Sequence, residues 1–354
     1  MMFILHPTLQ KVLSTSDVAY RSMITTELAR LLDIDSEFKF DEDNDNHQPS
    51  ATGEGFIVLE INFVNFAFSV FGTSLTHDGI CSISQLIKYI SRPDQIIEEG
   101  IFRKSGVKSR QHELHQMIAT GQTIDCQKYS VHDCCDLLKR FISELPQSLL
   151  TNGLEKFFLQ SLKLDSAQKQ LDTIRLLILL LPATNRIFLN EILTLFDNVA
   201  KHSNQNRMNI ENLARVFSPS IFRCHWSQST KSLSSSSATA ATAITANNHS
   251  SNSTIQNMLA ANQQSIDCLS MMIHNVRLIF EPPEQIIRDA TIFLANRIRL
   301  QKRTLQTAGH ENLVSVTNLS AIPAAKFCAT TEQSYSAKDY TERQVCSAIL
   351  FCLD

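Results

Sequence analysis

The chain has 354 residues, of which 43% are hydrophobic and 19% are charged. These proportions are ordinary for a globular protein, and they argue against a wholly disordered chain, a collagen or a coiled-coil array. The formal net charge of −3, from 32 basic and 35 acidic residues, lacks the electrostatic footprint of a nucleic-acid-binding protein.

The N-terminal part of the chain reads as an extension followed by a linker. Within 1–40, Leu28, Leu31 and Leu32 follow Met23 and Ile24 at helical spacing, which predicts a helix around 17–33. Residues 41–70 combine an acidic linker with an apolar lead-in. No stretch reaches the roughly 18 uninterrupted apolar residues of a membrane span, so we expect no transmembrane segment.

The densest helical periodicity lies in the predicted domain at 71–283. Apolar stripes at i, i+3, i+4 and i+7 predict successive helices, each followed by a helix-breaking residue: Pro93, Gly121, Pro146, Pro182 and Pro219. Ser109 is the expected N-cap of the helix that stops at Gly121. Gly and Pro are scarce, at nine each, and no period-2 run competes. The predicted fold class is all-α, a multi-helix bundle around one core.

The C-terminal part alternates unpatterned and helical segments. Residues 227–254 hold one charge and two large aliphatic side chains, too few to offset the entropy of ordering, and are predicted to be a disordered insertion. Helical periodicity resumes at 255–280, and 284–304 is predicted as a helical extension. No periodicity is found in 305–354, which is predicted to be a poorly ordered tail.

The nine cysteines indicate reduced thiols and no disulfide framework. Their number is odd, their spacing is irregular and no CxxC pair occurs. Because Met1 to Leu5 is too short for a secretory signal, we expect a protein of the cytoplasm or the nucleus. A zinc site or a thiol hydrolase at Cys126, His132, Cys134 and Cys135 is disfavoured, since adjacent helical residues point about 100° apart and nothing marks an activated thiolate.

The most informative segment is EGIFRKSG, residues 99–106. It places Arg103 between two glycines on a link between two predicted helices. Ile101 and Phe102 are expected to anchor the link in the core and to leave Arg103 projecting. A projecting guanidinium suits a phosphate, because it binds two oxygens at once. The alternative is that Arg103 only pairs with Glu98 or Glu99.

Two later segments carry further candidates. In Cys135 to Pro146, Lys139 and Ser143 share a flank just off the apolar face, where a lysine either extends its head into water or is a fixed donor. In Asn206 to Pro219, Asn209 is a good N-cap and Asn212 lies in the first turn. The alternative for Asn212 is a local capping contact.

These three segments, GIFRKSG, LLKRFISELPQSLLT and NRMNIENLARVFSP, in this order resemble the Rho GTPase-activating protein (RhoGAP) domain family. The resemblance runs from Phe71 to Pro283 and is interrupted by the insertion. It implies a RhoGAP-like helical bundle that is not itself an enzyme. Such a domain binds GTP-loaded Rho-family small GTPases and accelerates hydrolysis with an arginine finger, which switches Rho signalling off. It needs no cofactor of its own, since GTP and Mg²⁺ belong to the partner.

The resemblance also implies roles for individual residues. Arg103 matches the catalytic arginine finger. Four residues are expected to bind the GTPase: Lys104, Lys139, Ser143 and Asn212. Four are expected to shape the loop: Gly100, Phe102, Ser105 and Gly106. Many family members carry a second arginine where this chain has Ser143, which leaves the affinity open. A finer resemblance to one subfamily favours a RhoA-like partner, and the remaining alternative is an inactive GTPase-binding adaptor of the same fold.

Overall fold

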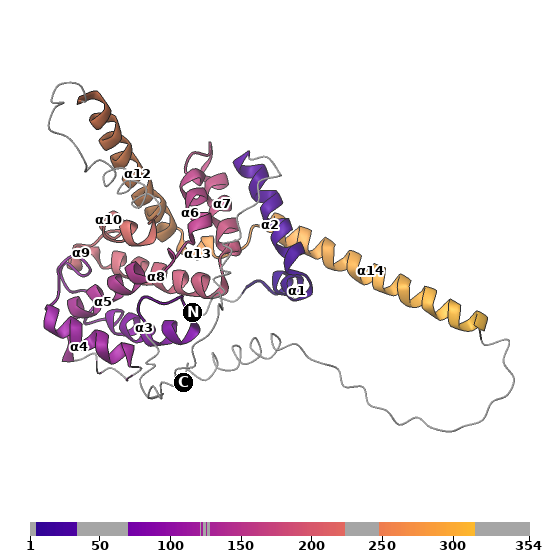
Figure 1. The fold of residues 1–354 in the computed structure, drawn as a ribbon, viewed down its shortest axis with the longest axis horizontal. Helices are drawn as coiled ribbons and strands as arrows, with labels where there is room; N and C mark the ends of the chain where they lie inside the picture. Colours follow the sequence, from indigo (N-terminus) through magenta and orange to yellow (C-terminus); the bar gives the residue numbers. More distant parts are fainter. Residues whose placement is uncertain are drawn as a thin grey trace, which may run out of the picture. The chain divides into compact units, whose positions relative to one another are not determined.

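The computed structural model describes the backbone of residues 5–33, 70–120, 122, 125, 128–223 and 248–315; within the last range, it describes side chains at 256 and 259–303. Regular secondary structure in these ranges is helical throughout (Figure 1), so the all-α prediction is confirmed. The predictions for the linker at 41–69, for most of the insertion and for most of the tail fall outside the described residues. The chain divides into two compact units, Met1–Arg297 and Ile298–Asp354.

Two helices begin the first unit: α1 (Pro7–Thr15) and α2 (Asp17–Leu32). The sequence pattern predicted only the second. Ser16 separates them, because its backbone amide closes α1 on the Val12 carbonyl while its hydroxyl accepts from the Ala19 amide. Helix α2 packs on α7 (Ala167–Leu180). The buried side chains of α1 and α2 thereby join the main core: Leu9, Val12, Tyr20, Ile24 and Leu28.

The middle of the first unit is a bundle built around α5 (Val131–Glu144) and α8 (Ala183–Lys201). Helices α3 (His77–Ile90), α4 (Lys108–Ala119) and α10 (Ile210–Ile221) pack against α5, and α8 packs against α3 and α10 (Figure 1). Helix α6 (Asn152–Ser161) packs on α7, and the short α9 (Ser203–Asn206) follows α8. As predicted, the apolar run from Leu176 to Leu181 is buried throughout.

The predicted end of α10 at Pro219 is wrong, because the helix continues through this proline to Ile221. Proline lacks an amide and removes one helical hydrogen bond. Ile221 and Phe222 are both fully buried, and the Phe222 amide still closes the last turn on the Ser218 carbonyl at 2.8 Å. Burial of these two large side chains offsets the lost bond.

The last helices of the chain are longer than their sequence patterns predicted. Helix α12 (Asn248–His274) begins within the predicted disordered insertion, and α14 (Glu284–Ser315) runs past 304. Between them lies α13 (Val276–Ile279). Both long helices have buried anchors, such as Leu269 and Ile286, and propagation from an anchored turn adds a hydrogen bond for each residue ordered. Among the described residues, no helix combines the length and apolarity needed to cross a membrane.

Candidate functional site

The segment that carries Arg103 connects α3 to α4 and is anchored by an aromatic cluster. Phe102 is fully buried and its ring contacts those of Phe196 in α8 and Phe217 in α10, with centroids 5.9 and 5.1 Å apart. Ile101 is also fully buried, whereas Arg103 is exposed. The predicted arrangement, an anchored loop with a projecting arginine, is the one observed.

The backbone at this point forms a tight turn. The amides of Arg103 and Lys104 both donate to the Gly100 carbonyl at 2.8 Å. Gly100 has a φ of 74°, and a Cβ there would lie 2.8 Å from the Cγ of Lys104. Phe102 has a φ of 65°, which is rare for a residue with a side chain and costs roughly 1–3 kcal/mol. Burial of its ring compensates for that strain.

The guanidinium of Arg103 has no hydrogen-bond or ion-pair partner within the described part of the chain. Glu99 instead lies 3.4 Å from the ammonium of Lys104, and Oε1 of Glu98 lies 4.0 Å from Nε2 of His132. The alternative in which Arg103 only pairs with a neighbouring glutamate is therefore wrong. An exposed arginine on a tight turn is available to a partner from outside.

Lys139, from α5, is a fixed donor to this turn. Its Nζ donates to the Phe102 carbonyl at 3.2 Å and lies 2.8 Å from Oδ1 of Asp136. Its neighbour Cys135 is fully buried, and burial raises the pKa of that thiol far above its usual range despite a hydrogen bond with the Phe102 backbone. Such a thiol is a poor nucleophile, which argues against the hydrolase alternative. The described residues hold no cluster of metal ligands; Cys126 is not among them.

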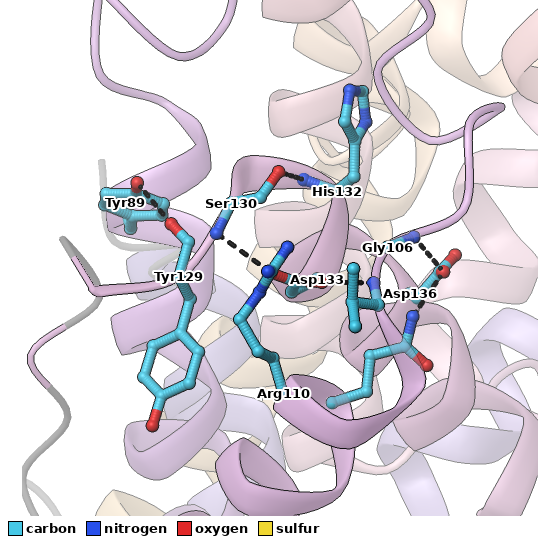
Figure 2. Close-up of polar contacts among 10 residues, drawn as sticks. Tyr89, Gly106, Arg110, Tyr129, Ser130, His132, Asp133 and Asp136 are labelled. Atoms are coloured by element: carbon cyan, nitrogen blue, oxygen red, sulfur yellow. Dashed lines mark hydrogen bonds and ion pairs between the residues drawn. The ribbon is translucent and has the colours of Figure 1, made fainter.

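The end of the loop is held by two carboxylates of α5 (Figure 2). The Gly106 amide donates to Oδ2 of Asp136 at 2.9 Å, and the Val107 amide donates to Oδ1 of Asp133 at 2.6 Å. Asp133 is fully buried, and its Oδ2 also accepts from Nε of Arg110 at 2.7 Å and from the Ser130 amide at 2.9 Å. The close packing requires a glycine at 106, because a Cβ there would lie 2.7 Å from the Cα of Asp133.

The predicted N-cap of α4, Ser109, is wrong. The helix begins at Lys108, so Ser109 already lies in its first turn, and the N-cap residue Val107 has no capping side chain. Charged oxygens of Asp133 and Asp136 hold the amides just before the helix instead. A carboxylate is a stronger acceptor than a hydroxyl, and these two come from a different helix, which local sequence rules do not consider.

The beginning of the loop is tied to the turn before α10 by Asn206, a residue that sequence reasoning missed. Asn206 is fully buried, and its backbone carbonyl accepts from the Gly100 amide at 2.8 Å. Its side chain donates to the carbonyls of Ile96 and Val199 at 2.9 and 2.8 Å and accepts from the Met208 amide at 2.8 Å. Asparagine in a turn is too common for the sequence to have marked this position.

The remaining candidates lie on α5, on α10 and in the loop itself. Asn209 caps α10 as predicted, by accepting from the Asn212 amide at 2.8 Å, and Nδ2 of Asn212 makes a local contact at 3.3 Å with the Arg207 carbonyl. Ser143 is exposed, and its hydroxyl lies 2.8 Å from that of Ser220. Ser105 is exposed in the loop. The structure thus gathers Arg103, Lys104 and Lys139 at one turn, with Ser143 and Asn212 on the two helices that flank it.

Comparison with known proteins agrees with this picture. A family model for the RhoGAP domain matches residues 81–225. The chain is 31% identical over 224 residues to Rho GTPase-activating protein 19 of Gallus gallus, which is 57% of this chain and 44% of that protein. It is 32% identical over 232 residues to Rho GTPase-activating protein 7 of Homo sapiens, which is 65% of this chain and 14% of that protein. Identities to both groups are alike, so they do not separate one subfamily from the other.

Solved structures also resemble the chain. For human Rho GTPase activating protein 15, the TM-score is 0.49 at 18% identity, covering 60% of this chain and 93% of that one. The chain spans less than half the length of the curated relatives named above. The family model covers α5, the loop with Arg103 and α10 up to its end. Over residues 81–225, the chain matches the RhoGAP domain family.

Proposed function

We propose that this chain accelerates GTP hydrolysis by a Rho-family small GTPase and that Arg103 is the residue it inserts into the nucleotide site. The observation that supports this most directly is the arrangement of the turn. Arg103 is exposed and has no partner among the described residues, while the residues before it are buried or hydrogen-bonded. A guanidinium with no partner in the described part of the chain can enter a GTPase without first breaking an ion pair there.

The chemistry requires little else from this chain. During phosphoryl transfer, negative charge spreads over the oxygens of the transferred group, and a planar guanidinium neutralises it through two parallel hydrogen bonds. An arginine finger raises the rate by about 10³–10⁵-fold, which corresponds to roughly 4–7 kcal/mol of transition-state stabilisation. The partner supplies GTP, Mg²⁺ and the group that orients the attacking water, so the activator needs no cofactor of its own.

The neighbouring residues have supporting roles in this proposal. Lys139 braces the turn through the Phe102 carbonyl, and its side chain is still 25% exposed, so its ammonium can also contact the GTPase. Lys104 is exposed in the turn, and Ser143 is exposed near the C-terminal end of α5. Asn212 is half-buried at the start of α10. We assign these four residues to the GTPase-binding surface.

We further propose a Rho-like partner and a location in the cytoplasm. The names of the relatives point to GTPases of the Rho family, and the buried cysteines Cys135 and Cys268 are free thiols. Free thiols fit a reducing compartment. Within the Rho family, we propose a preference for RhoA-like over Rac-like GTPases.

The test is GTP hydrolysis by a panel of purified Rho-family GTPases with a catalytic amount of this chain. We expect strong acceleration, with the largest effect on the RhoA-like members. An adaptor of the same fold would bind the GTP-loaded form and leave hydrolysis at its intrinsic rate. Binding without acceleration for every GTPase of the panel would contradict the proposal and favour the adaptor function.

A further inference from the structure

We propose that Asp136 is a positioning residue that sets the direction of Arg103 by holding the loop on both sides of it. This inference rests on the proposed function of Arg103. Asp136 lies on α5, one turn before Lys139, and only 14% of its side chain is exposed. Its two carboxylate oxygens contact different partners, Lys139 and Gly106.

Oδ1 acts on the residue just before Arg103. It lies 2.8 Å from Nζ of Lys139, which donates to the Phe102 carbonyl at 3.2 Å. A lysine at the edge of a core would otherwise extend its ammonium into water. The carboxylate keeps that ammonium over the Phe102 carbonyl, and the pair is partly shielded from solvent, so salt screens it less than a surface pair.

Oδ2 acts on the other side of the turn. It accepts from the Gly106 amide at 2.9 Å and from Nε2 of Gln111 in α4 at 2.8 Å (Figure 2). One carboxylate therefore holds the loop at two points: at Phe102, through Lys139, and at Gly106, three residues after Arg103. Few rotations are left to the segment between these points.

The strained conformation of Phe102 explains why such a clamp matters. A left-handed conformation of a non-glycine residue persists only where its surroundings over-determine it. The ring of Phe102 is held by Phe196 and Phe217, and its carbonyl is held by the Lys139–Asp136 pair. That carbonyl belongs to the peptide unit that enters Arg103, so its orientation sets the direction in which the arginine side chain leaves the backbone.

Asp133 differs from Asp136 in this respect. It is fully buried, and its partners are the amides of Val107 and Ser130 and the side chain of Arg110. These contacts join α4 to α5 and include no residue that holds the Phe102 carbonyl. We expect changes at Asp133 to unfold this corner of the domain, so Asp136 is the residue at which positioning can be separated from stability.

The test compares Asp136→Asn with Asp94→Asn. Asp94 is an exposed residue of the same α3–α4 connection, and its carboxylate contacts Arg92 and Gln95. Two quantities are measured: the maximal stimulated rate of hydrolysis at saturating chain, and the affinity for the GTPase loaded with a non-hydrolysable GTP analogue. For Asp136→Asn, we expect the maximal rate to fall by about 10²-fold, the loss typical of a small misplacement of a catalytic group. Affinity should change far less, and Asp94→Asn should alter neither quantity.

Two further variants exclude a merely structural role. Asp136→Glu keeps the charge and should recover part of the rate that Asp136→Asn loses. In an Arg103→Ala background, Asp136→Asn should have almost no additional effect, because a residue that acts through Arg103 has nothing left to position. Equal rate losses in both backgrounds, or a loss confined to affinity, would overturn the proposal.

Amide hydrogen exchange, measured on the free protein, tests whether Asp136 holds the loop independently of any effect on GTP hydrolysis. Asp136→Asn should speed exchange of the amides at 100–107, and Asp94→Asn should not. Unchanged exchange would show that Asp136 does not hold the loop, whatever the activity. If the wild-type chain stimulates none of the GTPases, the proposed function fails, and faster exchange in the variant would still establish the clamp.

Discussion

The backbone carbonyl of Asn206 accepts a hydrogen bond from the amide of Gly100 at 2.8 Å. This bond joins two segments that are distant in the sequence: the glycine-bounded loop with Arg103 and the turn that leads into α10. The side chain of Asn206 extends the connection to Ile96 at the start of the loop and to Val199 near the end of α8. Asn206 therefore links the two segments to each other and to α8.

Asn206→Ala should therefore destabilise the domain. The substitution leaves the carbonyl of Ile96 and the amide of Met208 without their buried partner, and each unpaired group costs about 1–3 kcal/mol. We expect the free energy of unfolding, measured with urea, to fall by at least about 2 kcal/mol. Asn204→Ala, at an exposed position of the same helix, is the control. Equal stability of the two variants would contradict the role given to Asn206.

Arg103→Ala should abolish most of the stimulated hydrolysis and leave the complex largely intact. The loss should approach the 10³–10⁵-fold attributed to an arginine finger, since Arg103 is the single arginine of the segment from Gly100 to Gly106. Arg103→Lys should recover little, because an ammonium lacks the planar fork. The measurement is single-turnover hydrolysis, with binding followed separately.

Lys104→Ala is the matched control for that experiment. Lys104 is the adjacent exposed cation, and its ammonium lies 3.4 Å from Glu99. We expect its loss to change affinity modestly and the maximal rate very little. Comparable rate losses for the two variants would mean that positive charge in general, and not Arg103, drives the reaction.

Lys139→Ala should weaken association with the GTPase. The substitution removes both the brace on the Phe102 carbonyl and an ammonium that is available to the partner. Half-maximal stimulation should then require a higher concentration of the chain, and loss of the brace should also lower the maximal rate. Lys169→Ala, which removes an exposed ammonium of α7 that pairs with Asp165, should leave the dose-response curve unchanged. An unchanged curve for Lys139→Ala would refute the interface role.

Glu191→Gln should stabilise the protein at neutral pH. Glu191 lies on α8 and accepts from the Ser84 hydroxyl at 2.8 Å, and burial raises the pKa of its carboxyl above its ordinary value. A raised pKa means that the folded state binds the proton more tightly than the unfolded state does. The resulting contribution to stability is complete below the ordinary pKa and is lost as pH rises through the pKa of the folded protein.

Thermal unfolding at two pH values checks this sign. At about pH 7, the neutral glutamine avoids the cost of a buried charge, so the variant should have a higher Tm than the wild type. Near pH 4, the wild-type carboxyl is largely protonated and the difference should shrink. Glu113→Gln, at an exposed position of α4, is the control for the loss of a surface carboxylate. A wild type that is more stable than Glu191→Gln at neutral pH would contradict the argument.

Helix positions were readable from the sequence because apolar periodicity is local. The stripe of Leu138, Phe141 and Ile142 identified α5, and all three side chains are buried. Helix ends were less predictable. Pro219 did not end α10, since burial of the following residues outweighs one lost hydrogen bond, and Ser109 did not cap α4, since carboxylates from α5 hold the preceding amides.

The sequence by itself determined the helical class, the glycine-bounded segment with Arg103 and the order of the three segments that resemble a RhoGAP domain. All of these depend on residue types at short spacing. Only the tertiary structure decided that Arg103 has no partner among the described residues, that Asp136 contacts both sides of its loop through Lys139 and Gly106, and that Asn206 bonds to Gly100 at the start of that loop. The Asp136–Gly106 bond joins residues 30 positions apart, and the Asn206–Ile96 bond joins residues 110 positions apart. Such contacts arise from how whole helices pack, and the same residue types without that packing would be ordinary surface or turn residues.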